Sequence, residues 1–281
     1  MGISLPVTLA VLGAALLHAS WNALLKSSPD KGLENVALAA GRGAIALALL
    51  PWVPAPAPAS WPWIAASVAV HVAYFWALAG AYRWGDLSFS YPVMRGGAPL
   101  LVALAGTAAF GEALSRWQGA ALALICAGIL GFARRPRGGA GDESRAMLFA
   151  LANAVVIAIY TLIDAHGVRA SGAALGYALW FFFANSVVQI AVFGGGRRRE
   201  AARYLARRWG RAAAGGAMTV GSYAIALWAM TLAPVALVAA LRETSVIFGA
   251  LIGLLFLGER LTRRRVLATG AVLAGLVALR L

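Results

Sequence analysis

Apolar runs, each about as long as a bilayer is thick, repeat along the whole chain and are separated by short polar or charged stretches. An α-helix needs roughly 20 apolar residues to cross the hydrocarbon layer. Ten runs approach this length between charges, prolines and glycines. We therefore predict an all-α integral membrane protein with ten transmembrane helices, near residues 5–25, 35–50, 62–82, 87–110, 117–133, 147–166, 174–193, 212–231, 234–256 and 265–280.

Composition supports this prediction. Hydrophobic residues make up 62% of the chain and charged residues 12%, against roughly 45–50% and 25% in soluble domains. A water-soluble core cannot hide so much apolar surface, and a disordered chain needs low hydrophobicity. The first run lacks the basic segment of a signal peptide, so we interpret it as a retained span.

The basic residues give an orientation. The net charge of +14 comes almost entirely from arginines, most of them clustered between apolar runs. With ten spans, the loops on the amino-terminal side contain only Arg116, Arg169 and Arg280, whereas those on the other side contain 18 basic residues. The positive-inside rule then puts both termini outside the cytoplasm and disfavours nucleic acid as the partner of these charges. The Ala, Arg and Gly bias with two lysines indicates a GC-rich bacterial genome, hence the inner membrane.

The two halves of the chain resemble each other. A shift of 147 residues superposes FGEALSR at 110–116 on LGERLTR at 257–263, Gly128 on Gly275, and Arg95 on Arg242. We predict one five-helix repeat in residues 1–138 and a second in 139–281. An odd number of spans per half inverts the second repeat relative to the first, and such repeats usually place the substrate site at their interface near the midplane.

With these motifs, the chain resembles EamA-type permeases of the drug/metabolite transporter superfamily. The resemblance rests on the GE-x-L-[ST] turns GEALSR (111–116) and GERLTR (258–263), and on HASWNALLK at 18–26, which is similar to the first-helix motif of an EamA subgroup. It implies secondary transport of a small metabolite by alternating access. The charge bias departs from many such permeases, whose amino terminus is inside.

Three arginines, Arg42, Arg95 and Arg242, fall within predicted spans. Each costs roughly 2.5–3.5 kcal/mol at mid-helix, so each should face the bundle interior. We predict that Arg95 and Arg242 bind an oxyanion of the substrate, because the guanidinium fork matches carboxylate and phosphate oxygens. The alternative is pairing with Asp164 and Glu243, which still leaves one positive charge in excess. For Arg42 we favour a structural role in charge balance.

Aromatic, imidazole and amide groups on the same helix faces are candidates for binding the rest of the substrate: His18, Trp21, Asn22, His71, Tyr74, Tyr91, Tyr160 and Tyr223. Their alternative role is packing, or an interfacial belt for Tyr and Trp. His18, His71, Asp164 and Glu243 are also candidates for coupling to protons, and a helix–helix hydrogen bond is the alternative for each of the two histidines.

The sequence contains no HExxH, GxSxG or Walker motif, so we predict no enzyme, no metal and no cofactor. The single Cys126 excludes an intrachain disulfide and has no partner for a CxxC site. We predict a permease or exporter, monomer or homodimer, for an anionic or zwitterionic metabolite. The rivals are a flippase for a lipid-linked anionic headgroup and an exporter of cationic or amphiphilic compounds.

Overall fold

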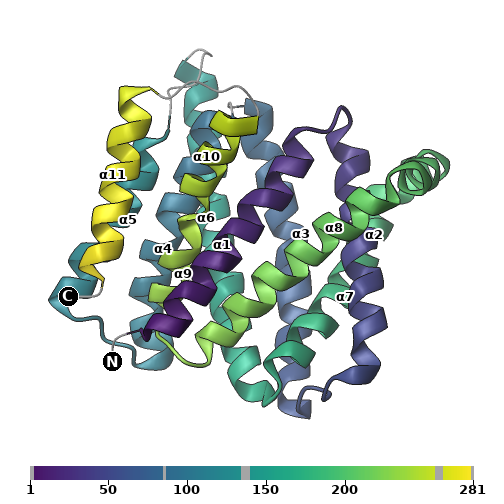
Figure 1. Cartoon of the computed structure of the whole chain (residues 1–281), viewed down its shortest axis with the longest axis horizontal. Helices are drawn as coiled ribbons and strands as arrows, with labels where there is room; N and C mark the ends of the chain where they lie inside the picture. Colours follow the sequence, from purple (N-terminus) through teal and green to yellow (C-terminus); the bar gives the residue numbers. More distant parts are fainter. Residues whose placement is uncertain (1–2, 85–86, 134–139, 257–261, 280–281) are drawn as a thin grey trace.

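The structure is a computed structural model, which describes residues 3–84, 87–133, 140–256 and 262–279. In these residues the chain forms a bundle of α-helices, and α1 begins at the same end of the bundle at which α11 ends (Figure 1). We call this the terminal end. The helices are α1 (Leu5–Lys26), α2 (Lys31–Leu49), α3 (Trp61–Trp84), α4 (Leu87–Phe110), α5 (Arg116–Gly131), α6 (Ala140–Ser171), α7 (Ala174–Gly194), α8 (Arg198–Met230), α9 (Val235–Glu243), α10 (Ser245–Phe256) and α11 (Arg263–Ala278).

Each predicted run coincides with a helix, or with the pair α9 and α10 in the run 234–256. In the described part of the chain, seven stretches are long and apolar enough to cross a membrane, and one of them, Ala174–Met230, contains both α7 and α8. The helix α5 is apolar but shorter. An all-α multi-pass membrane architecture is confirmed, while the number of ten spans stays a prediction.

Side-chain caps explain where several helices begin. The Asp30 carboxylate accepts the backbone N–H of Leu33 at the start of α2. Ser115 and Gln118 form a reciprocal capping box at the start of α5, and Thr262 accepts the N–H of Arg265 at the start of α11. The Ser or Thr of the GE-x-L-[ST] motif is therefore a helix N-cap in both halves. Residues 257–261 of the second copy lie outside the described residues.

Two loop predictions are wrong. The arginine cluster 197–211, expected as a loop, lies mostly in the first turns of α8, with a non-helical kink at Arg208 (Figure 1). The segment between the predicted runs 117–133 and 147–166 was also expected as a loop; its residues 140–146 lie in α6, and residues 134–139 lie outside the described residues. Arginine and alanine both have good helix propensity, so these helices continue past the point where apolarity stops.

Several helices of one half pack against helices of the other half, and the equivalent contact is also made with the two halves exchanged. α3 packs against α6, and its counterpart α8 packs against α1; α4 also contacts α6, while α9 and α10 contact α1. α5 packs directly on α11. A Cβ added at Gly128 would meet Val272, and one added at Gly275 would meet Ile125. Since Ile125 and Val272 are themselves 147 residues apart, this contact is reciprocal in the manner of a two-fold interface.

Candidate functional site

A small buried pocket lies between α4, α6 and α9. Its volume is about 10 Å³, room for about one water molecule. Arg95 comes from α4, Tyr160 and Thr161 from α6, and Arg242 and Glu243 from α9. The structure therefore brings the two repeat-related arginines to one cavity, enclosed on its other sides by small apolar residues. We call this the central pocket.

The buried acids in the pocket region differ in their partners. The Nε of Arg95 lies 2.6 Å from the Oε2 of Glu243, and both side chains are about 6% exposed. Arg242 forms no ion pair in the described residues; its guanidinium lies 4.9 Å from the ring centroid of Tyr223. Adjacent residues of a helix do not face each other, and Glu243 pairs across to α4 rather than with its neighbour Arg242.

Asp164 is fully buried on α6 and accepts two hydrogen bonds from tyrosines. Tyr177 donates to its Oδ1 over 3.0 Å, and Tyr223 donates to its Oδ2. The carboxylate therefore orients Tyr223, whose ring contacts the Arg242 guanidinium. Arg95, Arg242, Glu243 and Asp164 together form a cluster with two positive and two negative side chains.

The histidines adopt defined hydrogen-bonding roles. His18 Nε2 lies 3.3 Å from an Nη2 of Arg95. Because a guanidinium has no acceptor, His18 must accept there with an unprotonated Nε2. His71 Nδ1 lies 2.8 Å from the carbonyl oxygen of Ser67, so this nitrogen donates. In a neutral ring Nε2 is then the acceptor.

An aromatic layer joins His71 to the central pocket. The ring of His71 lies 4.3 Å from Tyr160 and 6.2 Å from Tyr74, and Tyr74 lies 6.0 Å from Tyr160. Tyr91 lies beneath Arg95, 5.8 Å from its guanidinium. Of the predicted binding residues, Arg95, Arg242, Tyr160, Tyr223, His71, Tyr74, Tyr91 and His18 thus belong to one connected group.

Trp21 and Asn22 lie at its margin. Asn22 donates from Nδ2 to the carbonyl oxygen of His18 in its own helix, over 2.7 Å. The Trp21 ring packs edge-on against His18 at 5.2 Å, and its buried Nε1 has no partner in the described residues. Trp21 therefore reaches this group through His18, whereas Asn22 is used locally.

α4 loses a backbone hydrogen bond close to the pocket but stays one helix, whereas the helix that carries Arg242 ends there. α4 contains Pro92 and Pro99, and Pro99 lacks the N–H that would bond the carbonyl of Arg95. On the other side, α9 ends at Glu243 and α10 begins at Ser245. Broken helices at the midplane are a feature of transporter substrate sites.

Arg42 lies apart from the central pocket. Its Nε and Nη2 donate to Ser186 Oγ and Asn185 Oδ1 on α7, both over 3.3 Å. It is 7% exposed and forms no ion pair in the described part of the chain. Arg42 is therefore held by neutral groups, and the expectation that an acid balances its charge has no counterpart in these contacts.

A polar cluster closes the terminal end of the bundle; we call it the terminal-end clasp. Glu112, in the turn after α4, pairs with Arg169 of α6 over 2.6 Å and accepts the N–H of Val235, the first residue of α9, over 2.8 Å. Arg169 also donates to the carbonyl oxygens of Met230 and Ala233. The clasp thereby ties the helix that carries Arg242 to both α4 and α6.

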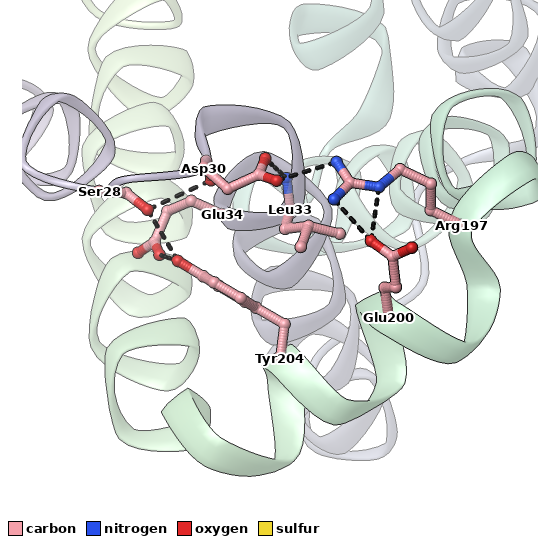
Figure 2. A network of polar contacts seen from close by, with 7 residues as sticks. All are labelled: Ser28, Asp30, Leu33, Glu34, Arg197, Glu200 and Tyr204. Atoms are coloured by element: carbon pink, nitrogen blue, oxygen red, sulfur yellow. Dashed lines mark hydrogen bonds and ion pairs between the residues drawn. The ribbon is translucent and has the colours of Figure 1, made fainter.

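A second cluster, the opposite-end clasp, joins the α1–α2 connection to the start of α8 (Figure 2). Tyr204 donates to the buried Glu34 over 2.5 Å, and Arg211 pairs with the same carboxylate over 3.2 Å. Asp30 pairs with Arg197 over 2.9 Å. The N–H of Leu33, and then Arg197, hold the pKa of Asp30 below its ordinary value.

Sequence reasoning missed several of these residues. Thr161 directly follows Tyr160 and lines the pocket, and Tyr177 binds Asp164 from the next helix; periodicity gives no signal for either. Glu112 could have been found, since it belongs to the GE-x-L-[ST] motif, but the motif alone does not reveal its partner Arg169.

Comparisons with known proteins agree with this architecture. Residues 144–281 match the model of the EamA-like transporter family. A solved crystal structure of another protein superposes with a TM-score of 0.73 over 98% of both chains at 18% identity, which shows a shared fold. No curated protein matches the sequence.

Proposed function

We propose that the chain is a transporter of the EamA-like family, whose model matches residues 144–281, and that it moves a small anionic or zwitterionic metabolite across the membrane by alternating access. The observation that carries this proposal is the meeting of Arg95 and Arg242 at one buried pocket together with Glu243. Two arginines offer oxyanion sites, and two nearby acids offer sites for an amino group.

The repeat relation supports a pseudo-two-fold axis through this pocket. Arg95 and Arg242 are 147 residues apart in the sequence. The same offset relates Gly128 to Gly275, which make reciprocal contacts between α5 and α11. We infer ten spans in two inverted five-helix repeats, 1–138 and 139–281. Rocking of one repeat against the other would open the pocket first to one side and then to the other.

The two clasps supply the closures that alternating access needs. Each clasp joins residues from both halves of the chain: Glu112 with Arg169 at the terminal end, and Glu34 with Tyr204 and Arg211 at the opposite end. With both clasps formed, the pocket has room for about one water molecule. We assign this arrangement to the occluded state, and each outward or inward opening to the release of one clasp.

The apolar lining of the lateral groove disfavours a flippase. A flippase needs a lateral groove with headgroup-binding charges in it. A lateral groove of about 430 Å³ does lie on α4 and α6, but Leu101, Leu104, Ala105, Val155, Ala158, Ile159 and Leu162 line it, and all are apolar. A screen of ligands that includes amines separates an exporter of cations from the proposed anion transporter.

Ligand-induced stabilisation tests the proposal. The purified chain is melted in the presence of carboxylates, phosphates, amino acids, amines and neutral sugars, and a ligand at 100 times its dissociation constant adds about 2.7 kcal/mol. We expect stabilisation by a carboxylate, phosphate or amino acid, lost in Arg242→Gln and kept in Arg203→Gln, which changes an exposed arginine of α8. Stabilisation by amines alone, or an unchanged response in Arg242→Gln, would contradict an anion site at Arg242.

A further inference from the structure

The charge in excess within the bundle lies at Arg42. The central cluster contains Arg95 and Arg242 with Glu243 and Asp164, so its formal charges cancel. Arg42 is buried and is always protonated, and within the described part of the chain its hydrogen-bond partners are the neutral Asn185 and Ser186. An uncompensated charge inside a membrane bundle is expensive and is a functional-site candidate by default.

A second observation points to a ligand at the same place. Gln189 is 2% exposed, and neither its Nε2 nor its Oε1 has a hydrogen-bond partner in the described residues. It lies one helical turn after Asn185 and three residues after Ser186, on the face of α7 that meets Arg42. A buried amide with both groups unmet is costly unless some other group satisfies it.

The run Gly41-Arg42-Gly43 fixes Arg42 against α7. A Cβ at Gly41 would lie 2.0 Å from the carbonyl oxygen of Ala212, and one at Gly43 would lie 2.8 Å from the Cβ of Ser186. Both glycines are therefore needed for α8 and α7 to approach α2 on either side of the arginine. The two 3.3 Å hydrogen bonds of Arg42 are at the long end of the normal range, so a better acceptor can replace them.

We propose that Arg42, Asn185, Ser186 and Gln189 form a second, separate oxyanion subsite, for a carboxylate or phosphate-like group of the transported molecule. It deepens the proposed function and rests on it, because the subsite would bind a second oxyanion group of the molecule that the central pocket binds. The guanidinium balances the charge of the oxyanion, and the Gln189 amide donates to one of its oxygens.

The experiment uses inorganic phosphate and acetate as oxyanion probes, with acetamide as the uncharged analogue of acetate. The melting temperature of the full chain is followed as each probe is titrated. We expect phosphate or acetate, but not acetamide, to stabilise the wild type. Arg42→Gln should weaken the apparent affinity tenfold or more, Arg42→Lys less than Arg42→Gln, and the exposed-site control Arg203→Gln not at all.

Gln189→Leu keeps Arg42 and tests the subsite if Arg42→Gln fails to fold. It should weaken the oxyanion response severalfold. A response that survives Arg42→Gln and Gln189→Leu but disappears in Arg242→Gln would overturn the subsite and leave the central pocket standing. A response lost in the Arg42 and Gln189 variants but kept in Arg242→Gln supports the subsite and counts against the central anion site. No response to either oxyanion in the wild type overturns the subsite.

Discussion

Arg95 and Glu243 form a buried ion pair in which each side chain compensates the charge of the other. The pair spans 2.6 Å between α4 and α9, and both side chains are about 6% exposed. Removing one partner of such a pair leaves a buried charge uncompensated, which costs about 3–5 kcal/mol, whereas removing both is far less costly. Replacing both residues therefore tests the role of Arg95 in transport with little loss of stability.

Glu243→Gln should lower the free energy of unfolding by about 3–5 kcal/mol, and adding Arg95→Gln should recover most of this loss. The measurement is a double-mutant cycle by thermal or denaturant unfolding in one detergent. The double variant should be folded yet inactive in proteoliposome transport. Additive losses in the cycle would show that the two groups do not depend on each other.

The sequence alone predicted which arginines are buried, but not their partners. Arg42, Arg95 and Arg242 were predicted to face the interior because lipid exposure is so costly, and all three are less than 9% exposed. Their pairing depends on which helix faces cross. Glu243 turns toward α4 and Asp164 toward the tyrosines of α7 and α8. Arg42, assigned to charge balance from the sequence, donates to neutral groups instead.

At the scale of helices, the crossing of α2 and α8 depends on a glycine in each helix. A Cβ at Gly41 would lie 2.0 Å from the backbone carbonyl oxygen of Ala212, and a Cβ at Gly216 would lie 2.6 Å from the backbone of Arg42. Backbone cannot rotate away as a side chain can, so the helices would have to separate.

Gly41→Ala should therefore destabilise the protein by about 1–3 kcal/mol through overpacking, and should also weaken the contacts of Arg42. The matched control is Gly13→Ala in α1, where nothing lies within 4 Å of the added Cβ. Alanine is the better helix former, so the control should be neutral or stabilising. Equal melting temperatures for the two variants would refute the close crossing.

The junction of α2 with α8 has a pH dependence with a definite sign. Hydrogen bonding by the Leu33 N–H and then by Arg197 lowers the pKa of Asp30 from its ordinary value of 3.8. A lowered pKa contributes stability above the ordinary value, and this contribution disappears as the pH falls through the folded-state pKa. Wild type should melt higher than Asp30→Asn at neutral pH, and the difference should shrink as the pH drops below 3.8. A constant difference would contradict the role of charge.

Helix positions were the most predictable part of the fold, since apolar runs and cap residues report on them directly. The predicted runs 87–110 and 174–193 differ from α4 and α7 by at most one residue. The ends of α6 and α8 were wrong because charge marks where a helix leaves the membrane, not where it ends. The break at Thr244 between α9 and α10 follows no proline or glycine, so the sequence contained no local signal for it.

For the whole molecule, the repeat is the feature from which most of the site follows. An offset of 147 residues relates Arg95 to Arg242, Gly128 to Gly275 and the N-caps Ser115 and Thr262. In the proposed two-fold arrangement, equivalent residues meet at the axis, and this would bring two arginines that are far apart in the sequence to one pocket. The two clasps lie at opposite ends of this arrangement and involve different residues, so each can be released alone.

This independence leads to a prediction for accessibility. Replacing Cys126 with Ala and Thr161 with Cys places one thiol at the central pocket. Glu112→Gln then removes the ion pair of the terminal-end clasp, and Tyr204→Phe removes a donor to Glu34 at the opposite end. Loss of a hydrogen bond to a charged group is worth about 1.5–3 kcal/mol, enough for a tenfold or larger population shift.

In sealed vesicles of known orientation, a membrane-impermeant maleimide should label the Thr161→Cys thiol faster from the terminal side in Glu112→Gln, and faster from the opposite side in Tyr204→Phe. The side from which the Glu112→Gln variant reacts faster also shows which side of the membrane the terminal end faces. The arginine distribution predicts that the terminal end lies outside the cytoplasm. If both variants open the pocket to the same side, or neither changes its labelling, the clasps are not the gates of this transporter, and the closures must be sought in the apolar packing between the repeats.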